Sequence, residues 1–149
     1  MTRPVRRALS AALLAALAPA ASAAGLQLWQ QSAAGLGVAY AGSAAVADNA
    51  GTIYYNPAGM TRLPGIQLSV GGTMTWSTYD YSGPGGKDDG GASLGTGNGY
   101  ASWQATPDLA LGFGVSQPFG LKSDYSAGWP GAAQALRSDL ETVNYNPSI

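Results

Sequence analysis

The chain has 149 residues, a formal net charge of −1 at pH 7 and only 10% charged residues, well below the roughly 25% of ordinary globular proteins. It contains no cysteine and no histidine, which excludes a disulfide framework, a thiolate metal site and histidine-based acid–base catalysis. Residues 24–149 have no basic cluster, so nucleic acid is not expected as a partner. Neither a cofactor nor a metal site is expected.

The first 23 residues have the three-part layout of a secretory signal peptide. Arginines open the segment, an Ala- and Leu-rich run covers residues 8–18, and Ala21-Ser22-Ala23 forms an A-x-A cleavage site. The apolar run is too short to span a bilayer as a helix, and no later run is long enough. We therefore expect residues 1–23 to be removed on export, leaving Ala24 as the first mature residue.

Residues 24–64 are rich in glycine and alanine and follow neither the period of a strand nor that of a helix. Short helical turns are possible around residues 44–47, but a long helix is not. Glycines recur every few residues, which is typical of an irregular segment. Such a segment has to pack inside something else to stay ordered.

A strict two-residue period begins at Ile66. Alternate positions up to Trp76 are apolar except for Gly72, whereas the positions between them are small or polar. This pattern indicates a strand with one face toward lipid and the other toward a polar lumen. The run also has about the length of 9–11 residues that a tilted strand needs to cross a bilayer.

The rest of the chain reads as further strands separated by loops of unequal length. A long polar loop is expected over residues 80–98, a second strand over 99–105 and a third over 109–117. Thr106-Pro107-Asp108 is a tight turn, because proline restricts the backbone and aspartate supports the bend. A second long loop is expected over residues 118–137, with a fourth strand beginning near Ser138.

Alternating long loops and short turns are typical of outer-membrane barrels, whose long loops face outward. Trp76 and Trp103 suit the aromatic girdle of such a barrel. The predicted fold class is therefore all-β, the N-terminal part of a transmembrane antiparallel β-barrel. On composition alone, a secreted soluble β-protein is the alternative. Three strands and part of a fourth cannot close a barrel, so we expect the chain to be a fragment of a longer protein.

Several motifs resemble the FadL-type family of outer-membrane transporters for long-chain fatty acids and other hydrophobic compounds. They are AGLQL (24–28), QSAAGLG (31–37), AYAG (39–42), DNA (48–50), YNPAGMT (55–61), QPFGLKS (117–123) with Trp129, DLET (139–142) and NYNPS (144–148). The resemblance implies a fourteen-stranded barrel plugged by an N-terminal hatch. Residues 24–64 would then be the hatch, and residues 65–149 the first strands of the barrel.

The resemblance also implies site residues. In the family the extreme N-terminus reaches the ligand pocket, the hatch moves, and ligands leave sideways beside a kinked third strand. Packing and turn formation are alternative roles for the same residues, and Asp48 would need a partner, either Arg62 or a barrel residue outside this chain. The residues implied are Leu26, Leu28, Phe119 and Leu121 for ligand contact; Asp48, Asn56, Pro57, Ala58 and Gly59 for hatch gating; and Gly112 and Gly114 for the lateral opening.

The implied function is passive diffusion of hydrophobic small molecules, above all long-chain fatty acids, through a plugged barrel with lateral exit. The complete protein would be a monomer surrounded by outer-membrane lipid. An uptake channel for aromatic hydrocarbons is an alternative, and a structural or adhesive outer-membrane protein is another. An enzyme is not expected, because the sequence offers no histidine and no G-x-S-x-G motif.

Overall fold

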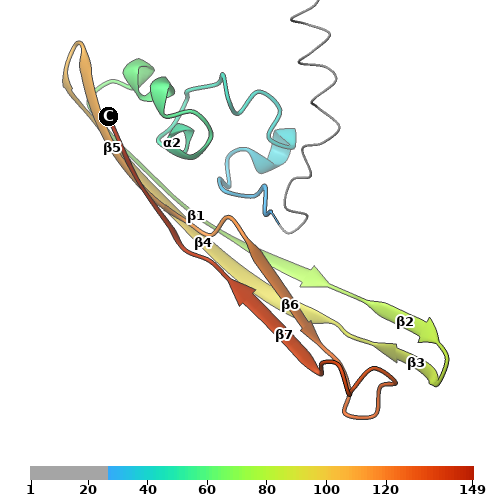
Figure 1. Ribbon diagram of the computed structural model, residues 1–149. Helices are drawn as coiled ribbons and strands as arrows, with labels where there is room; N and C mark the ends of the chain where they lie inside the picture. Colours follow the sequence, from blue (N-terminus) through green and yellow to red (C-terminus); the bar gives the residue numbers. More distant parts are fainter. Residues whose placement is uncertain (1–26) are drawn as a thin grey trace, which may run out of the picture.

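The computed structural model describes residues 27–149, so the expected signal peptide and Leu26 lie outside the described residues. Four antiparallel strands form one curved sheet in the order β1-β4-β5-β8 (Figure 1). Their bounds are Ile66–Ser77 for β1, Ala92–Thr106 for β4, Leu109–Ser116 for β5 and Asn144–Ser148 for β8. The strand predicted to begin at Ile66 is β1, and this start is confirmed.

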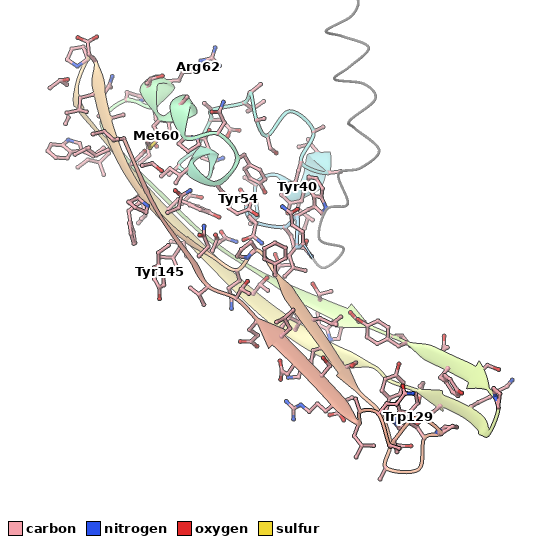
Figure 2. The ribbon with its side chains drawn as sticks, in the orientation of Figure 1. Tyr40, Tyr54, Met60, Arg62, Trp129 and Tyr145 are labelled. Carbon is pink, nitrogen blue, oxygen red and sulfur yellow. The ribbon has the colours of Figure 1, made fainter. Side chains whose placement is uncertain are left out.

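The sheet has an apolar outer face, as its two-residue period predicts. Leu68, Val70 and Trp76 of β1 are each about three-quarters exposed there, and β4, β5 and β8 add Trp103, Phe113 and Tyr145. The opposite face is made mainly of small and polar residues, with Leu94 and Tyr100 of β4 as larger exceptions. Figure 2 shows Tyr145 projecting from the outer face, away from the segment that carries Tyr54 and Met60. No helix in the described part of the chain is long and apolar enough to cross a membrane.

The predicted long loop at residues 80–98 is wrong. Strand β4 begins at Ala92 and pairs with the whole length of β1, from Ile66↔Trp103 to Ser77↔Ala92. Beyond this ladder, β2 (Asp80–Gly83) and β3 (Gly86–Asp89) form a hairpin that continues the sheet outward. The first half of the strand was hidden because its outward positions there are Ser93, Gly95, Gly97 and Gly99, which leave no apolar residue for the period to show.

The expected loop at residues 118–137 and the fourth strand also need correction. The loop opens with a strand, β6 (Gly120–Asp124), which pairs with β7 (Arg137–Glu141). The predicted fourth strand is divided: β7 pairs with β6, and only β8 returns to the main sheet beside β5. The predicted tight turn at Thr106-Pro107-Asp108 joins β4 to β5 and is confirmed.

Residues 27–63 lie against the inner face of the sheet and contain only short helical turns (Figure 1). These turns are η2 (Leu36–Val38), α2 (Thr52–Tyr55) and η3 (Pro57–Arg62). Near residues 44–47 the backbone makes a single turn, in which the Val46 N–H donates to the Gly42 carbonyl at 2.8 Å. The segment is therefore irregular, as its composition predicts.

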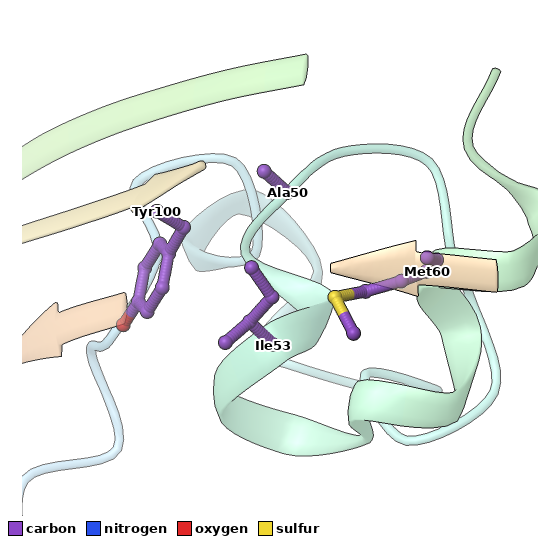
Figure 3. Packing of buried hydrophobic residues seen from close by; sticks show 5 residues of the cluster. Ala50, Ile53, Met60 and Tyr100 are labelled. Carbon is purple, nitrogen blue, oxygen red and sulfur yellow. The ribbon is translucent and has the colours of Figure 1, made fainter. Parts of the chain in front are cut away.

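A small apolar core joins this segment to the sheet. Ala50, Ile53 and Met60 from the segment pack against Tyr100 of β4 and Ala110 of β5, and all five are buried (Figure 3). The Asn146 side chain of β8 donates a hydrogen bond to the Ile53 carbonyl at 3.0 Å. This core and this hydrogen bond attach the segment to β4, β5 and β8.

Candidate ligand cavity and wall interruption

The wall is interrupted between β5 and β6, over residues 117–119. Strand β5 ends at Ser116, and β6 begins at Gly120 in a separate two-stranded sheet. Pro118 accounts for the break, because proline has no backbone N–H to donate to a sheet ladder. Phe119 is bonded to Thr142, which lies just after β7. The Phe119 carbonyl accepts hydrogen bonds from the Thr142 backbone N–H at 3.2 Å and from the Thr142 hydroxyl at 3.0 Å.

The first described residues of the chain fill this interruption. The Leu28 N–H donates to the Pro118 carbonyl at 2.8 Å, and Gln27 forms an isolated antiparallel bridge with Phe119. The main chain of residues 27–28 therefore pairs with wall residues that have left the main ladder. Removing residues 27–28 would leave this part of the wall without its partner.

Gln31 forms hydrogen bonds to both sides of the interruption. Its side chain is 1% exposed, and its amide nitrogen donates to the carbonyls of Gln117 at 2.8 Å and Leu28 at 3.1 Å. The Gln31 carbonyl accepts a bond from the Tyr100 hydroxyl at 2.8 Å. One buried residue thus joins the N-terminal residues, the interruption and strand β4.

A cavity of about 310 Å³ lies directly beside this junction. Its apolar lining comes from Leu28 of the N-terminal segment, Leu94 of β4 and Leu121 of β6. Ligand pockets of proteins typically range from about 300 to 1,000 Å³, so the cavity is large enough to hold part of a small molecule. The remaining lining residues are Gln27, Thr75, Ser77, Tyr79, Gly120 and Lys122.

The predicted ligand contacts are divided by the structure. Leu28 and Leu121, far apart in the sequence, line one cavity, whereas Phe119 belongs to the interruption and is not among the lining residues. Gly120 lets β6 come close, because an added Cβ there would lie 2.6 Å from Leu94 Cδ2 and 3.1 Å from Leu28 Cδ1. Contact of these residues with a ligand stays a prediction.

Ion pairing occurs beside the cavity, between β6 and β7. The Asp139 carboxylate lies 2.9 Å from the Arg137 guanidinium and 3.7 Å from the Lys122 ammonium. These are the two ion pairs among residues 27–149. The hydrogen bond from Arg137 holds the pKa of Asp139 below its usual value, and the nearby Lys122 acts in the same direction.

Asp48 does not pair with Arg62, which was one of the two kinds of partner expected for it. Asp48 is exposed and accepts a hydrogen bond from the Asn49 amide at 2.7 Å, while the Arg62 guanidinium donates to the Ala45 carbonyl at 3.2 Å. Asp48 instead borders a second cavity, of about 300 Å³, within the N-terminal segment.

The NPAG residues have clear local roles. The Asn56 amide donates to the Ala44 carbonyl at 2.7 Å, and Pro57 opens η3, where its missing N–H costs no helical bond. The Ala58 carbonyl accepts a bond from the Thr61 hydroxyl at 2.9 Å. Gly59 is buried so close to Ala47 that an added Cβ would lie 2.9 Å from Ala47 Cβ. Their part in gating stays a prediction.

Gly112 and Gly114 of β5 lie under the apolar core, not at the interruption. An added Cβ at Gly112 would lie 3.0 Å from Ile53 Cδ1, and one at Gly114 would lie 2.8 Å from Tyr100 Cδ1. The space above both glycines is therefore taken up by the N-terminal segment and by Tyr100. Pairing with β8 runs without a break from Gly112 to Ser116. A role of either glycine in lateral opening stays a prediction.

Sequence reasoning missed Gln31, Gln117 and Lys122 as residues of this region. A signal for the interruption was present, since Pro118 directly follows an otherwise regular strand. Gln31 opens one of the motifs that resemble the family, but its role could not be read from that motif, because it bonds to the Gln117 carbonyl 86 positions further along the chain.

An antiparallel sheet with an apolar outer face, a polar inner face and a packed inner segment defines the wall of a transmembrane β-barrel. The family model for the outer membrane protein transport protein (OMPP1/FadL/TodX) matches residues 14–149. The chain belongs to this family of outer-membrane transport proteins, which are not enzymes. The predicted fold class and outer-membrane localisation are confirmed.

Several relatives agree with this assignment. The chain is 32% identical to the 47 kDa outer membrane protein of Pasteurella multocida over 99% of its own length and 35% of the relative's. It is 35% identical to outer membrane protein P1 of Haemophilus influenzae over 94% of its length and 35% of the relative's. Identity to the long-chain fatty acid transport protein of Escherichia coli K12 is 29%, over 93% and 32% of the two chains. The chain thus spans about a third of the length of these relatives.

Proposed function

We propose that this chain forms the hatch and first strands of a barrel that admits long-chain fatty acids by passive diffusion. Residues 24–64 would be the hatch and residues 65–149 the start of the wall. The relative from Escherichia coli, named as a long-chain fatty acid transport protein, supports this choice of ligand.

The observation that carries the proposal is the position of Leu28. Its side chain lines the apolar cavity, and its main chain pairs with Pro118 in the wall interruption. Any molecule that displaces Leu28 from the cavity therefore strains the contact that closes the wall. Filling the cavity and opening the wall are coupled through a single residue.

The energies involved are compatible with this coupling. Each hydrogen bond that holds residues 27–31 against the wall contributes about 0.5–1.5 kcal/mol. Each methylene of a ligand moved from water into an apolar cavity contributes about 0.8 kcal/mol. Burial of a few methylenes thus offsets the loss of one or two bonds, provided that the ligand contacts the displaced state better than the resting one.

The test is Leu121→Asp in a complete barrel that carries this segment. A carboxylate in the apolar lining should weaken oleate binding at least about tenfold, because an unpaired buried charge is costly. Leu136→Asp is the matched control, since Leu136 is 42% exposed and does not line the cavity. Radiolabelled oleate binding and uptake are measured with the amount of folded barrel in parallel. Equal binding by both variants at normal barrel levels would refute the proposed ligand site.

A further inference from the structure

Lys122 is the one charged side chain among the nine residues that line the cavity at Leu28. Its side chain is 29% exposed, so the ammonium is partly shielded from water beside an apolar surface formed by Leu28, Leu94 and Leu121. A cavity with this lining can hold an apolar chain and an anionic group at the same time. A purely apolar ligand would gain nothing from the charge.

The ion pair that Lys122 makes is weak, and its partner is secured elsewhere. Lys122 and Asp139 are directly opposite each other in the β6–β7 ladder, with 3.7 Å between ammonium and carboxylate. Arg137 binds the same carboxylate oxygen at the shorter distance of 2.9 Å. If the ammonium turns to another anion, Asp139 keeps its guanidinium partner and is not left as an isolated charge. The exchange therefore avoids the cost of breaking an ion pair on one side only.

We propose that Lys122 binds the carboxylate of an amphiphilic ligand and makes the cavity selective for fatty acids over neutral hydrocarbons. This inference rests on the proposed function, because it assigns the head-group position of the same site. Asp139 serves as the resting partner of Lys122 and gives it up when the ligand arrives. The ligand's chain lies against Leu94 and Leu121, and its carboxylate accepts a charge-assisted hydrogen bond from the ammonium.

The test compares oleate with methyl oleate, which has the same chain but no charge. In the complete barrel, oleate should bind about tenfold more tightly than methyl oleate, as expected for a hydrogen bond between charged groups. Lys122→Met should abolish this difference by weakening oleate binding alone, and Lys122→Arg should restore it. Lys87→Met removes a lysine from the distant β2–β3 hairpin and should change neither affinity.

Asp139→Asn should change the affinity for oleate, which it would not do if Lys122 had only a structural role. Without the competing carboxylate, Lys122 should bind oleate several-fold more tightly, with methyl oleate unchanged. Equal affinity of the unmodified protein for the two ligands, or an equal loss of both in Lys122→Met, would overturn the inference.

The inference and the proposed function fail in different ways. If Leu121→Asp weakens binding of both ligands while Lys122→Met affects neither, the cavity is the ligand site and the head-group assignment is wrong. If Leu121→Asp changes no binding, the site itself is wrong and the inference falls with it.

Discussion

Gly114 determines how closely the N-terminal segment can approach the wall. The Tyr100 ring and Ile53 occupy the space above this glycine, at 2.8 Å and 3.2 Å from where a Cβ would lie. Tyr100 is 2% exposed and its hydroxyl is bonded to the Gln31 carbonyl, so the ring cannot move aside without breaking that bond. The absence of a side chain at one position thus sets the fit of the whole core.

Gly114→Val should therefore destabilise the packing of residues 27–63 by about 1–3 kcal/mol, the usual cost of an overpacked core. Limited proteolysis of the assembled barrel would show faster cleavage within this segment. Gly97→Val is the control, because an added Cβ at Gly97 meets nothing within 4 Å. Equal protease resistance of the two variants would contradict the packing seen here.

Tyr55 makes the N-terminal segment sensitive to alkaline pH. Burial raises the pKa of Tyr55 to about 12, and its hydroxyl donates to the Trp29 carbonyl at 3.0 Å. Because the folded pKa lies above the ordinary value near 10, the neutral form favours the packed state. The stabilisation is complete below pH 10 and is lost as the pH rises toward 12.

We expect residues 27–63 to become protease-sensitive between about pH 10 and 12, the range between the ordinary and raised pKa values of tyrosine. Tyr55→Phe removes this ionisation and should shift the onset to higher pH. Cleavage of the assembled barrel by an alkali-stable protease measures the transition. An identical onset in both proteins would mean that another group controls the segment.

At the scale of elements, the main feature is that a wall strand and the N-terminal segment complete each other. Pro118 ends the ladder of β5, and residues 27–28 supply the missing pairing. The segment is joined to this place mainly by hydrogen bonds, whereas its contact near Met60 is apolar. Hydrogen-bonded contacts contribute little net energy and reform easily, so this is the end that would move under the proposed function.

Gln31→Ala should loosen this end and leave the apolar core intact. Two carbonyls, those of Leu28 and Gln117, lose a buried donor, which costs about 1–3 kcal/mol. Hydrogen–deuterium exchange should accelerate at residues 27–31 and remain unchanged at residues 50–60. Gln30→Ala provides the comparison, because the Gln30 amide makes only a 3.5 Å bond to Thr75. Similar exchange in the two variants would argue against Gln31 as the fastening residue.

For the whole molecule, the outer face of the sheet matches the thickness of a membrane. Trp103 is opposite Ile66, and Trp76 is ten residues further along β1. At about 3.3 Å per residue this distance is roughly 33 Å, and a strand tilt of about 40° reduces the height to roughly 25 Å. An apolar band of about 25 Å between aromatic girdles is what membrane barrels present to lipid.

Val70→Arg should therefore hinder insertion by about 2–4 kcal/mol, since Val70 lies near the middle of this band and is 76% exposed. Ser69→Arg, at the same depth but on the inner face, should cost much less. Folding of the complete barrel into lipid vesicles, followed by heat-modifiable migration on gels, compares the two. A larger penalty for Ser69→Arg would reverse the assignment of the two faces.

The sequence by itself determined the features that are local and periodic. The start of β1 and the apolar outer face follow from alternation, because successive strand residues point to opposite sides. The turn at residues 106–108 follows from its proline and aspartate. Strand β4 was only partly recognised, since glycines replace the apolar residues on its outward side and leave the period without a signal. The family motifs added the outer-membrane setting, which composition alone left open.

Only the tertiary structure decided which distant residues meet. Leu28 and Leu121 were chosen from motifs, but their shared cavity depends on β6 leaving the main sheet and crossing near the N-terminal residues. Asp48 and Arg62 have opposite charges, yet Asp48 accepts a hydrogen bond from Asn49 and Arg62 donates one to the Ala45 carbonyl. Contacts of this kind join residues up to 93 positions apart in the sequence, as between Asn146 and Ile53, and no local pattern encodes them.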